Sequence, residues 1–131
     1  MAIGRSFEEV IQKACRMVNP ALDGLEGEDS KIVDEDEDLE NCLRIPTDTR
    51  LFAVQLALEK GWGVQKVHNL TKIDKWFLSK LQNIANMRAA CKQAAGLEKL
   101  LSSNPRTRLR SLKIAGFSDR QVCCSVPQCC R

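Results

Sequence analysis

The chain has 131 residues, enough for one domain with extensions and a single modest core. No apolar run approaches the ~20 residues that a membrane-spanning helix needs. The first twenty residues carry five charged side chains and no unbroken apolar core, so we expect neither a membrane span nor a secretion signal.

The net charge of +3 conceals an asymmetry, because residues 1–46 sum to −7 and residues 47–131 to +10. The bases of the second half are spread over several predicted helices, as on a solvated helical surface, so nucleic acid is not an expected partner. Without a secretion signal, Cys15, Cys42 and Cys91 are interpreted as small, buried or half-buried hydrophobic residues and not as disulfide partners.

The first predicted helix begins at Ser6 and ends near Pro20. Ser6 and Glu9 have the spacing of a capping box, in which the hydroxyl accepts from the amide of residue 9 and the carboxylate reaches back. Apolar residues then recur with the helical period, at Phe7, Val10, Ile11, Ala14 and Val18. Nothing else in the sequence offers an obvious cover for this stripe, so we expect the helix to be detached from the others.

The segment that follows is strongly acidic, with nine acids and one base between Glu26 and Glu40. Charge repulsion and a shortage of apolar groups favour a flexible linker over residues 21–42. An acidic metal site is the alternative, but the regularly spaced Asp and Gly of a calcium-binding loop are absent. No metal site is therefore predicted in this segment.

The next helix is predicted to start at Pro46-Thr47-Asp48 with Thr47 as its cap. A wide apolar stripe follows, formed by Leu51, Phe52, Val54, Gln55, Leu56 and Leu58. A stripe of this width is typical of a core helix. Gly61 suits the left-handed residue that ends such a helix.

Two helix corners share one local pattern. Gly61-Trp62-Gly63 with Val67 resembles Gly116-Phe117-Ser118 with Val122, 55 residues later. Each has a helix-ending glycine, an aromatic residue, a small cap residue, and a valine placed to pack on the aromatic ring. In the second corner, Gln121 completes a capping box. Duplication and common packing rules both remain open as explanations.

A longer helix is predicted from Asp74, as cap, towards Ala95, and a further one from Arg106 to Ala115. No segment alternates with the period of a β-strand. The sequence therefore predicts an all-α fold, a compact bundle of several short helices preceded by one detached N-terminal helix and an acidic linker.

No catalytic, cofactor-binding or metal-binding residue is predicted. His68 is the single histidine, and without an indicated nucleophile or carboxylate partner it is interpreted as a surface or capping residue. No glycine-rich phosphate loop is present. In the tail, Cys124 directly follows Cys123 and Cys130 directly follows Cys129. Two cysteines adjacent in sequence are poorly placed to bind one zinc ion together.

The candidate interface consists of four aromatic residues, Phe52, Trp62, Trp76 and Phe77, because aromatic side chains anchor many protein interfaces. For Phe77, burial in the core is the favoured reading. Trp76 lies at a different angle on the same helix, and its interface and core readings both remain open.

Four motifs follow one another along the chain: Met1–Glu9 (MAIGRSFEE), Pro46–Ala53 (PTDTRLFA), Leu70–Leu78 (LTKIDKWFL) and Gly116–Gln121 (GFSDRQ). In this order they resemble the oligomerisation domain of the large chain of carbamoyl-phosphate synthetase. In that family the region is helical, carries no catalytic groups and lies between two ATP-grasp halves. Those halves use ATP and Mg²⁺ to form carbamoyl phosphate from bicarbonate and, in most members, glutamine-derived ammonia.

The resemblance implies an order of parts. Residues 1–20 would end the first, carboxyphosphate-forming ATP-grasp half, and 21–42 would be a variable linker. Residues 43–122 would be the helical oligomerisation domain. Residues 123–131 depart from the family, as a truncation or an unrelated end would.

The resemblance also implies a non-catalytic fragment of that ligase, with ATP and Mg²⁺ bound only by the rest of the parent. Its expected partners are the ATP-grasp halves, further copies of itself, and a glutaminase domain or subunit. The expected location is the cytoplasm, or alternatively the mitochondrial matrix, and the pathway is that of pyrimidines or arginine.

Two other readings remain open. One is a stand-alone helix–turn–helix DNA-binding module, in which Gln65, Lys66 and Asn69 would form a thin recognition face. The other is the nonfunctional product of a partial gene.

Overall fold

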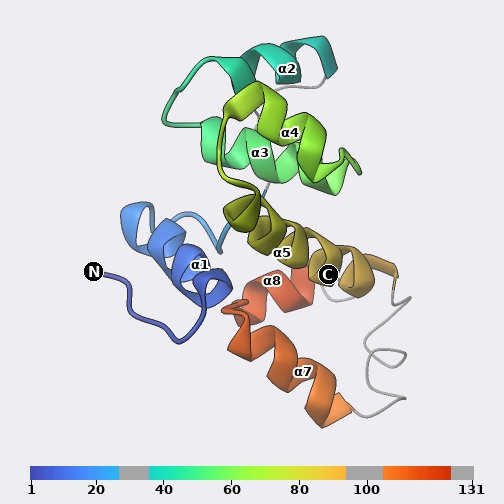
Figure 1. Cartoon of the computed structure of the whole chain (residues 1–131). Helices are drawn as coiled ribbons and strands as arrows, with labels where there is room; N and C mark the ends of the chain where they lie inside the picture. Colours follow the sequence, from blue (N-terminus) through green and yellow to red (C-terminus); the bar gives the residue numbers. More distant parts are fainter. Residues whose placement is uncertain (27–35, 94–104, 125–131) are drawn as a thin grey trace. The chain divides into compact units, whose positions relative to one another are not determined.

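The computed structural model describes residues 1–26, 36–93 and 105–124, and all regular structure in these ranges is helical (Figure 1). The all-α prediction is confirmed. The helices are α1 (Phe7–Val18), α2 (Asp36–Arg44), α3 (Arg50–Glu59), α4 (Val64–Thr71), α5 (Lys75–Gln93), α7 (Pro105–Ile114) and α8 (Asp119–Cys124).

The chain divides into two compact units. Residues 25–85 supply one unit, with α2, α3, α4 and the first part of α5. The other unit combines residues 1–24 with the described residues from 86 onward, so that it holds α1, the end of α5, α7 and α8. The cysteine side chains of the tail, and most of the acidic segment, lie outside the described residues.

In the unit of residues 25–85, α3 is the central core helix. Six consecutive residues of this helix, from Ala53 to Leu58, are buried. Helices α2 and α4 both pack on α3 and on each other (Figure 1). The predicted core role of this helix is therefore confirmed.

The sequence does not predict helix α2, because residues 36–42 belong to the segment that its charge predicts to be a linker. Leu39 and Leu43, one helical turn apart, are fully buried, while Asp38 is exposed. Two leucines four residues apart are enough to dock a short helix that keeps Asp38 in water. Because most residues of this segment are charged, the apolar stripe formed by Leu39 and Leu43 is not evident from its composition.

The predicted cap of α3 is wrong by two residues. The helix begins at Arg50 with Thr49 in the cap position, and Thr49 makes no side-chain capping bond. The hydroxyls of Thr47 and Thr49 lie 3.0 Å apart and pair with each other. The Thr47 carbonyl accepts from the Arg50 amide at 3.2 Å, so a turn separates Thr47 from the helix.

The two repeated corners have the same backbone structure. Gly61 and Gly116 both lie in the left-handed region, with φ of 86° and 87°. Each helix end closes with the same pair of bonds: Gly61 N–H to Leu58 O (3.1 Å), Trp62 N–H to Ala57 O (2.9 Å), Gly116 N–H to Lys113 O (3.1 Å) and Phe117 N–H to Leu112 O (3.1 Å). This is the Schellman arrangement, which confirms the prediction for Gly61.

The other predicted caps are present. The Ser118 hydroxyl accepts from the Gln121 amide at 3.0 Å, and the Gln121 side chain accepts from the Ser118 amide at 2.9 Å. The Asp74 carboxylate accepts from the amide of Trp76 at 2.7 Å. These bonds satisfy amides that the first helical turn leaves without partners.

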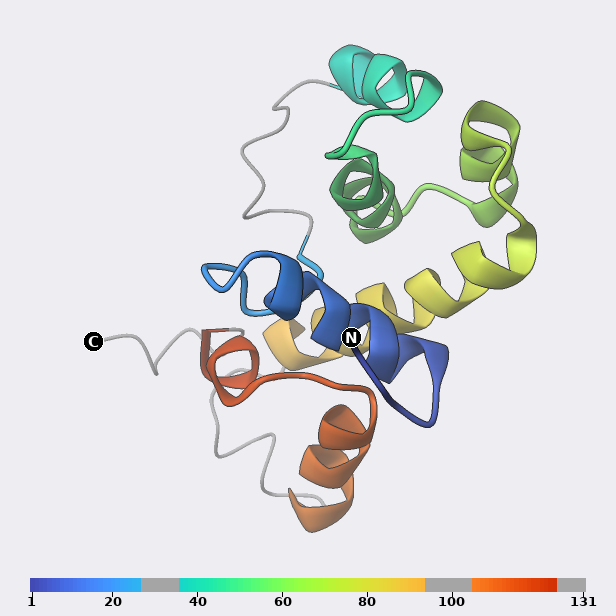
Figure 2. The same cartoon turned by 90° about the vertical axis from the view of Figure 1, so that its left-hand side faces the viewer.

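Helix α1 lies beside the turn between α7 and α8 (Figure 2). Arg16 donates to the Gly116 carbonyl at 2.9 Å, and the buried amides of Gln121 and Gln12 are joined by a 3.1 Å hydrogen bond. The sequence predicts a detached helix, whereas in the structure α1 docks on a corner 100 residues away. The reason is that the contact is made by backbone and polar groups, which an apolar pattern does not reveal.

The buried face of α1 is not its apolar stripe. Glu8, Gln12 and Cys15 are buried, whereas Val18 is 86% exposed and Met17 56%. The apolar stripe lies about 100° around the helix from the buried residues, because successive residues are separated by about 100°. The apolar side of α1 is therefore partly open.

Candidate functional site

The single histidine has a structural position. The Nδ1 atom of His68 lies 2.7 Å from the Ile73 carbonyl, just beyond the C-terminal end of α4. Thr71 donates to the Val67 carbonyl at 2.8 Å, and the Arg50 guanidinium donates to the Thr71 carbonyl. These bonds fasten the end of α4, which agrees with the reading of His68 as a capping residue.

Among residues 1–26, 36–93 and 105–124, no three acids, cysteines or histidines gather where they could hold a metal ion. Within the same ranges, no helix combines the length and the apolar character that crossing a membrane requires. The described residues thus offer no constellation for metal-assisted chemistry.

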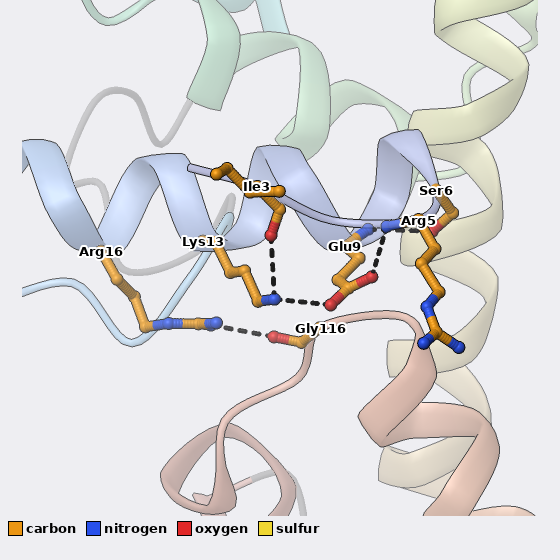
Figure 3. A network of polar contacts seen from close by, with 7 residues as sticks. All are labelled: Ile3, Arg5, Ser6, Glu9, Lys13, Arg16 and Gly116. Carbon is orange, nitrogen blue, oxygen red and sulfur yellow. Dashed lines mark hydrogen bonds and ion pairs between the residues drawn. The ribbon is translucent and has the colours of Figure 1, made fainter. Parts of the chain in front are cut away.

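A polar network joins the N-terminal residues to α1 (Figure 3). Lys13 bonds the Glu9 carboxylate at 2.5 Å and the Ile3 carbonyl at 3.1 Å. The same carboxylate accepts from the Arg5 amide at 2.8 Å, and the Ser6 hydroxyl accepts from the Glu9 amide at 3.2 Å. The hydrogen bonds from Lys13 and then from Arg5 lower the pKa of Glu9.

Two of the described cysteines, Cys15 and Cys91, are buried and have thiols of low reactivity. Burial raises the pKa of Cys15 and of Cys91, which keeps both thiols protonated and weakly nucleophilic at neutral pH. This confirms the reading of these two residues as small hydrophobic side chains. Cys42 is half-buried on α2.

The most exposed aromatic surface lies on the first turn of α5. Trp76 is 53% exposed and Phe77 44%. Their ring centroids are 5.0 Å apart with planes at 89°, and the Lys80 ammonium lies 5.4 Å from the Trp76 centroid. The core reading of Phe77 is therefore wrong, because the inward positions of this turn are taken by Leu78 and, further along, Leu81.

The other two candidate residues lie elsewhere in the same unit. Phe52 is half-buried on α3, and Trp62 is half-buried in the α3–α4 turn. The Lys66 ammonium lies 3.5 Å above the Trp62 ring and 2.8 Å from a Glu40 carboxylate oxygen. The structure thus pairs Trp76 with Phe77, whereas the contact that it records for the Trp62 ring is with Lys66.

The three residues of the DNA-binding alternative are exposed and contact one another or neighbours in the same unit. Gln65 donates to Asn69 at 3.0 Å, and Lys66 pairs with Glu40 and Trp62. The sequence does not predict the Arg16–Gly116 and Gln12–Gln121 hydrogen bonds. Both join residues at least 100 positions apart, and no local pattern in the sequence marks them.

Comparison with known sequences gives a consistent result. Residues 1–128 match the family described as carbamoyl-phosphate synthetase large chain, oligomerisation domain. The chain is 46% identical over 123 residues to the mitochondrial arginine-specific carbamoyl phosphate synthase large chain of Schizosaccharomyces pombe. The aligned residues make up 93% of this chain and 10% of that protein.

Two further relatives come from animals. The mitochondrial carbamoyl-phosphate synthase [ammonia] of Mus musculus is 41% identical over 124 residues, covering 93% of this chain and 8% of that protein. The multifunctional protein CAD of Squalus acanthias is 37% identical over 126 residues, covering 96% of this chain and 5% of that protein. The chain thus spans a tenth or less of the length of these relatives.

Proposed function

Because this chain belongs to the family of carbamoyl-phosphate synthetase large-chain oligomerisation domains, we propose that it is a non-catalytic assembly module of a longer enzyme. The observation that carries this proposal is the exposed Trp76–Phe77 pair, two large aromatic side chains held in a fixed mutual geometry at a capped helix start. Aromatic anchors of this kind dominate the energetics of protein interfaces.

The parent protein is proposed to be an ATP- and Mg²⁺-dependent ligase that forms carbamoyl phosphate from bicarbonate and glutamine-derived ammonia. Residues 1–20 would end its first ATP-grasp half, and residues 43–122 would be the assembly domain. The partly open apolar side of α1, with Val18 86% exposed, supports a neighbour on that side. The names of the Schizosaccharomyces pombe and Mus musculus relatives, both carbamoyl phosphate synthases, support this activity for the parent.

The proposed partners are the two ATP-grasp halves, further copies of the same domain and a glutaminase domain or subunit. The proposed location is the cytoplasm, with the mitochondrial matrix as the alternative. The mitochondrial relatives favour the matrix alternative, while the multifunctional relative has no location in its name.

Sedimentation of the full chain in reducing buffer tests the assembly role. We expect a concentration-dependent dimer or larger species, with strong helical circular dichroism. Trp76→Ala should weaken association by about thirtyfold, which corresponds to the ~2 kcal/mol of an interface hot spot. Ile114→Ala removes an equally exposed apolar side chain from the other unit (60% exposed) and should leave the mass distribution unchanged.

A helical monomer at every concentration would contradict self-assembly by this module alone. Equal effects of Trp76→Ala and Ile114→Ala would contradict the role given to the aromatic pair. In a separate assay, we expect the purified chain to form no carbamoyl phosphate from ATP, bicarbonate and ammonia, and detectable product would overturn the non-catalytic assignment.

A further inference from the structure

The exposed aromatic pair Trp76–Phe77 lies in a strongly basic part of the chain. Residues 60–97 contain seven lysine and arginine residues and a single acid, Asp74. The Asp74 carboxylate accepts from the Trp76 amide at 2.7 Å, so this acid caps the start of α5. The aromatic pair is therefore surrounded in the sequence by positive charge.

Three lysines lie within four residues of Trp76, and they form a basic aromatic patch with the two rings: Lys72, Lys75, Trp76, Phe77 and Lys80. Lys72 and Lys75 are exposed. Lys80 follows Trp76 by four residues and Phe77 by three, so it shares a face of α5 with both rings. Its ammonium lies 5.4 Å from the Trp76 centroid. The patch thus combines two apolar anchors with three positive charges.

The positive charge limits what this patch can bind. If two copies of the chain met patch to patch, six lysines, three from each copy, would gather at one interface. Like charges brought together in this way oppose association, whereas an acidic counterpart adds attraction. The patch is therefore complementary to an acidic surface and not to a second copy of itself.

The chain carries such an acidic counterpart in its first half. Asp34–Asp38 is a run of five consecutive acids, and residues 1–46 sum to a charge of −7. Asp38, at the end of this acidic run, is exposed on α2. A second copy of the chain therefore offers the negative charge that the patch requires.

The unit of residues 25–85 already contains one contact of this chemistry. The Lys66 ammonium lies 3.5 Å from the centroid of the Trp62 ring and 2.8 Å from a carboxylate oxygen of Glu40, two residues after the acidic run. An acid of α2, a lysine and a tryptophan are thus joined in one arrangement. Trp76 and Lys80 form a lysine–tryptophan pair of the same kind, to which carboxylates of the acidic run are suited.

We propose that the basic aromatic patch of one copy docks on the acidic run Asp34–Asp38 of a second copy. The two rings supply the apolar contact, and the three lysines pair with carboxylates of the run. The proposal rests on the assembly role proposed above and adds which surface of the second copy the aromatic pair meets. Self-association by this contact weakens with salt, because added ions screen exposed charges from one another.

Sedimentation of the full chain in reducing buffer tests the contact. Between about 0.1 M and about 1 M NaCl the Debye length falls from about 10 Å to about 3 Å, and the association constant should fall at least about tenfold. At the lower salt, Lys75→Glu should weaken association about tenfold. Arg106→Glu makes the same change of charge on an exposed residue of the other unit and should stay within about twofold of the original chain. Both substitutions place an acid in the first turn of a helix, where the helix dipole favours it, so both variants should keep their helical circular dichroism.

An exchange of charges identifies the acidic run as the occupant. Glu35→Lys reverses one charge of the run and should by itself weaken association about tenfold. In an equimolar mixture of Lys75→Glu and Glu35→Lys, the altered patch of one variant meets the altered run of the other with opposite charges. Association between the two variants should therefore recover to within about threefold of that of the original chain.

The outcomes separate this proposal from the assembly role. Self-association that ignores salt but is still weakened by Trp76→Ala would keep the assembly role and overturn docking on the acidic run. Stronger association of Lys75→Glu would do the same, since this is the result expected when patch meets patch. The proposal is also overturned by equal effects of Lys75→Glu and Arg106→Glu, by unchanged association of Glu35→Lys, or by no recovery in the mixture. A monomer at every concentration would overturn both proposals.

Discussion

The two repeated corners, at Gly61 and Gly116, allow the same substitution to be made at a test site and at a control site. Gly116→Ala and Gly61→Ala both place a Cβ atom on a residue with φ near 87°. Only at Gly116 does that atom collide with another element, the backbone of α1 at Glu9, at 2.9 and 3.0 Å. The difference between the two variants therefore isolates the contact between α1 and the corner.

The expected magnitudes follow from these geometries. A non-glycine residue in the left-handed region costs about 1–2 kcal/mol, and this is the full cost expected for Gly61→Ala. At Gly116 the neighbouring atoms belong to backbone and cannot rotate away, so an overpacking cost of about 1–3 kcal/mol is added. Gly116→Ala should therefore destabilise its unit by about 2–5 kcal/mol, a large part of the stability of a small domain.

Hydrogen exchange followed by residue is the appropriate assay, because it separates the two units. In Gly116→Ala, exchange should accelerate in α1 and α8, while α3 and α4 keep their protection. In Gly61→Ala, the modest acceleration should fall on α3 and α4 instead. Equal losses of stability in the two variants, or unchanged exchange in α1 of Gly116→Ala, would refute the backbone contact as the element that holds α1.

Three further outcomes are expected. Ser118→Ala should cost about 0.5–2 kcal/mol in chemical denaturation, whereas Thr49→Ala, which removes no side-chain cap, should be nearly neutral. The pKa of Glu9 is lower in the folded state than in the unfolded chain. The ionised Glu9 carboxylate therefore stabilises the fold at pH values above the ordinary pKa of a carboxyl group, and this stabilisation is lost as the pH falls through the lowered pKa. Glu9→Gln should therefore flatten the acid limb of the stability profile. In peptide mapping after thiol alkylation, Cys91 should react more slowly than the half-buried Cys42.

Local patterns predicted the features that are local in origin. Gly61 ends its helix as expected because only glycine adopts a left-handed conformation without strain. The caps at Asp74 and Ser118 form because donor and acceptor are two or three residues apart, so that the sequence alone places them in reach.

Features decided by distant contacts were missed or misplaced. Leu39 and Leu43 are buried against neighbouring helices, whereas the density of charge in their segment predicts a linker. Phe77 is outward-facing because Leu78 fills the core side of the same turn, a choice that composition does not fix. The interface residues remain a prediction, because exposure of Trp76 is necessary for docking and does not establish a partner.

The register of α1 is set by the corner and not by its own amphipathic pattern. Burying apolar side chains is worth about 25 cal/mol per Å², so a helix free to rotate would turn its apolar stripe inward. Instead Gln12 is fully buried, whereas the stripe is only half-buried over most of its length and Val18 is 86% exposed. The Arg16 bond to Gly116 and the close approach of Glu9 hold the helix in this orientation. A substitution that opens the corner should therefore release α1 to rotate, and so change which of its side chains are exposed.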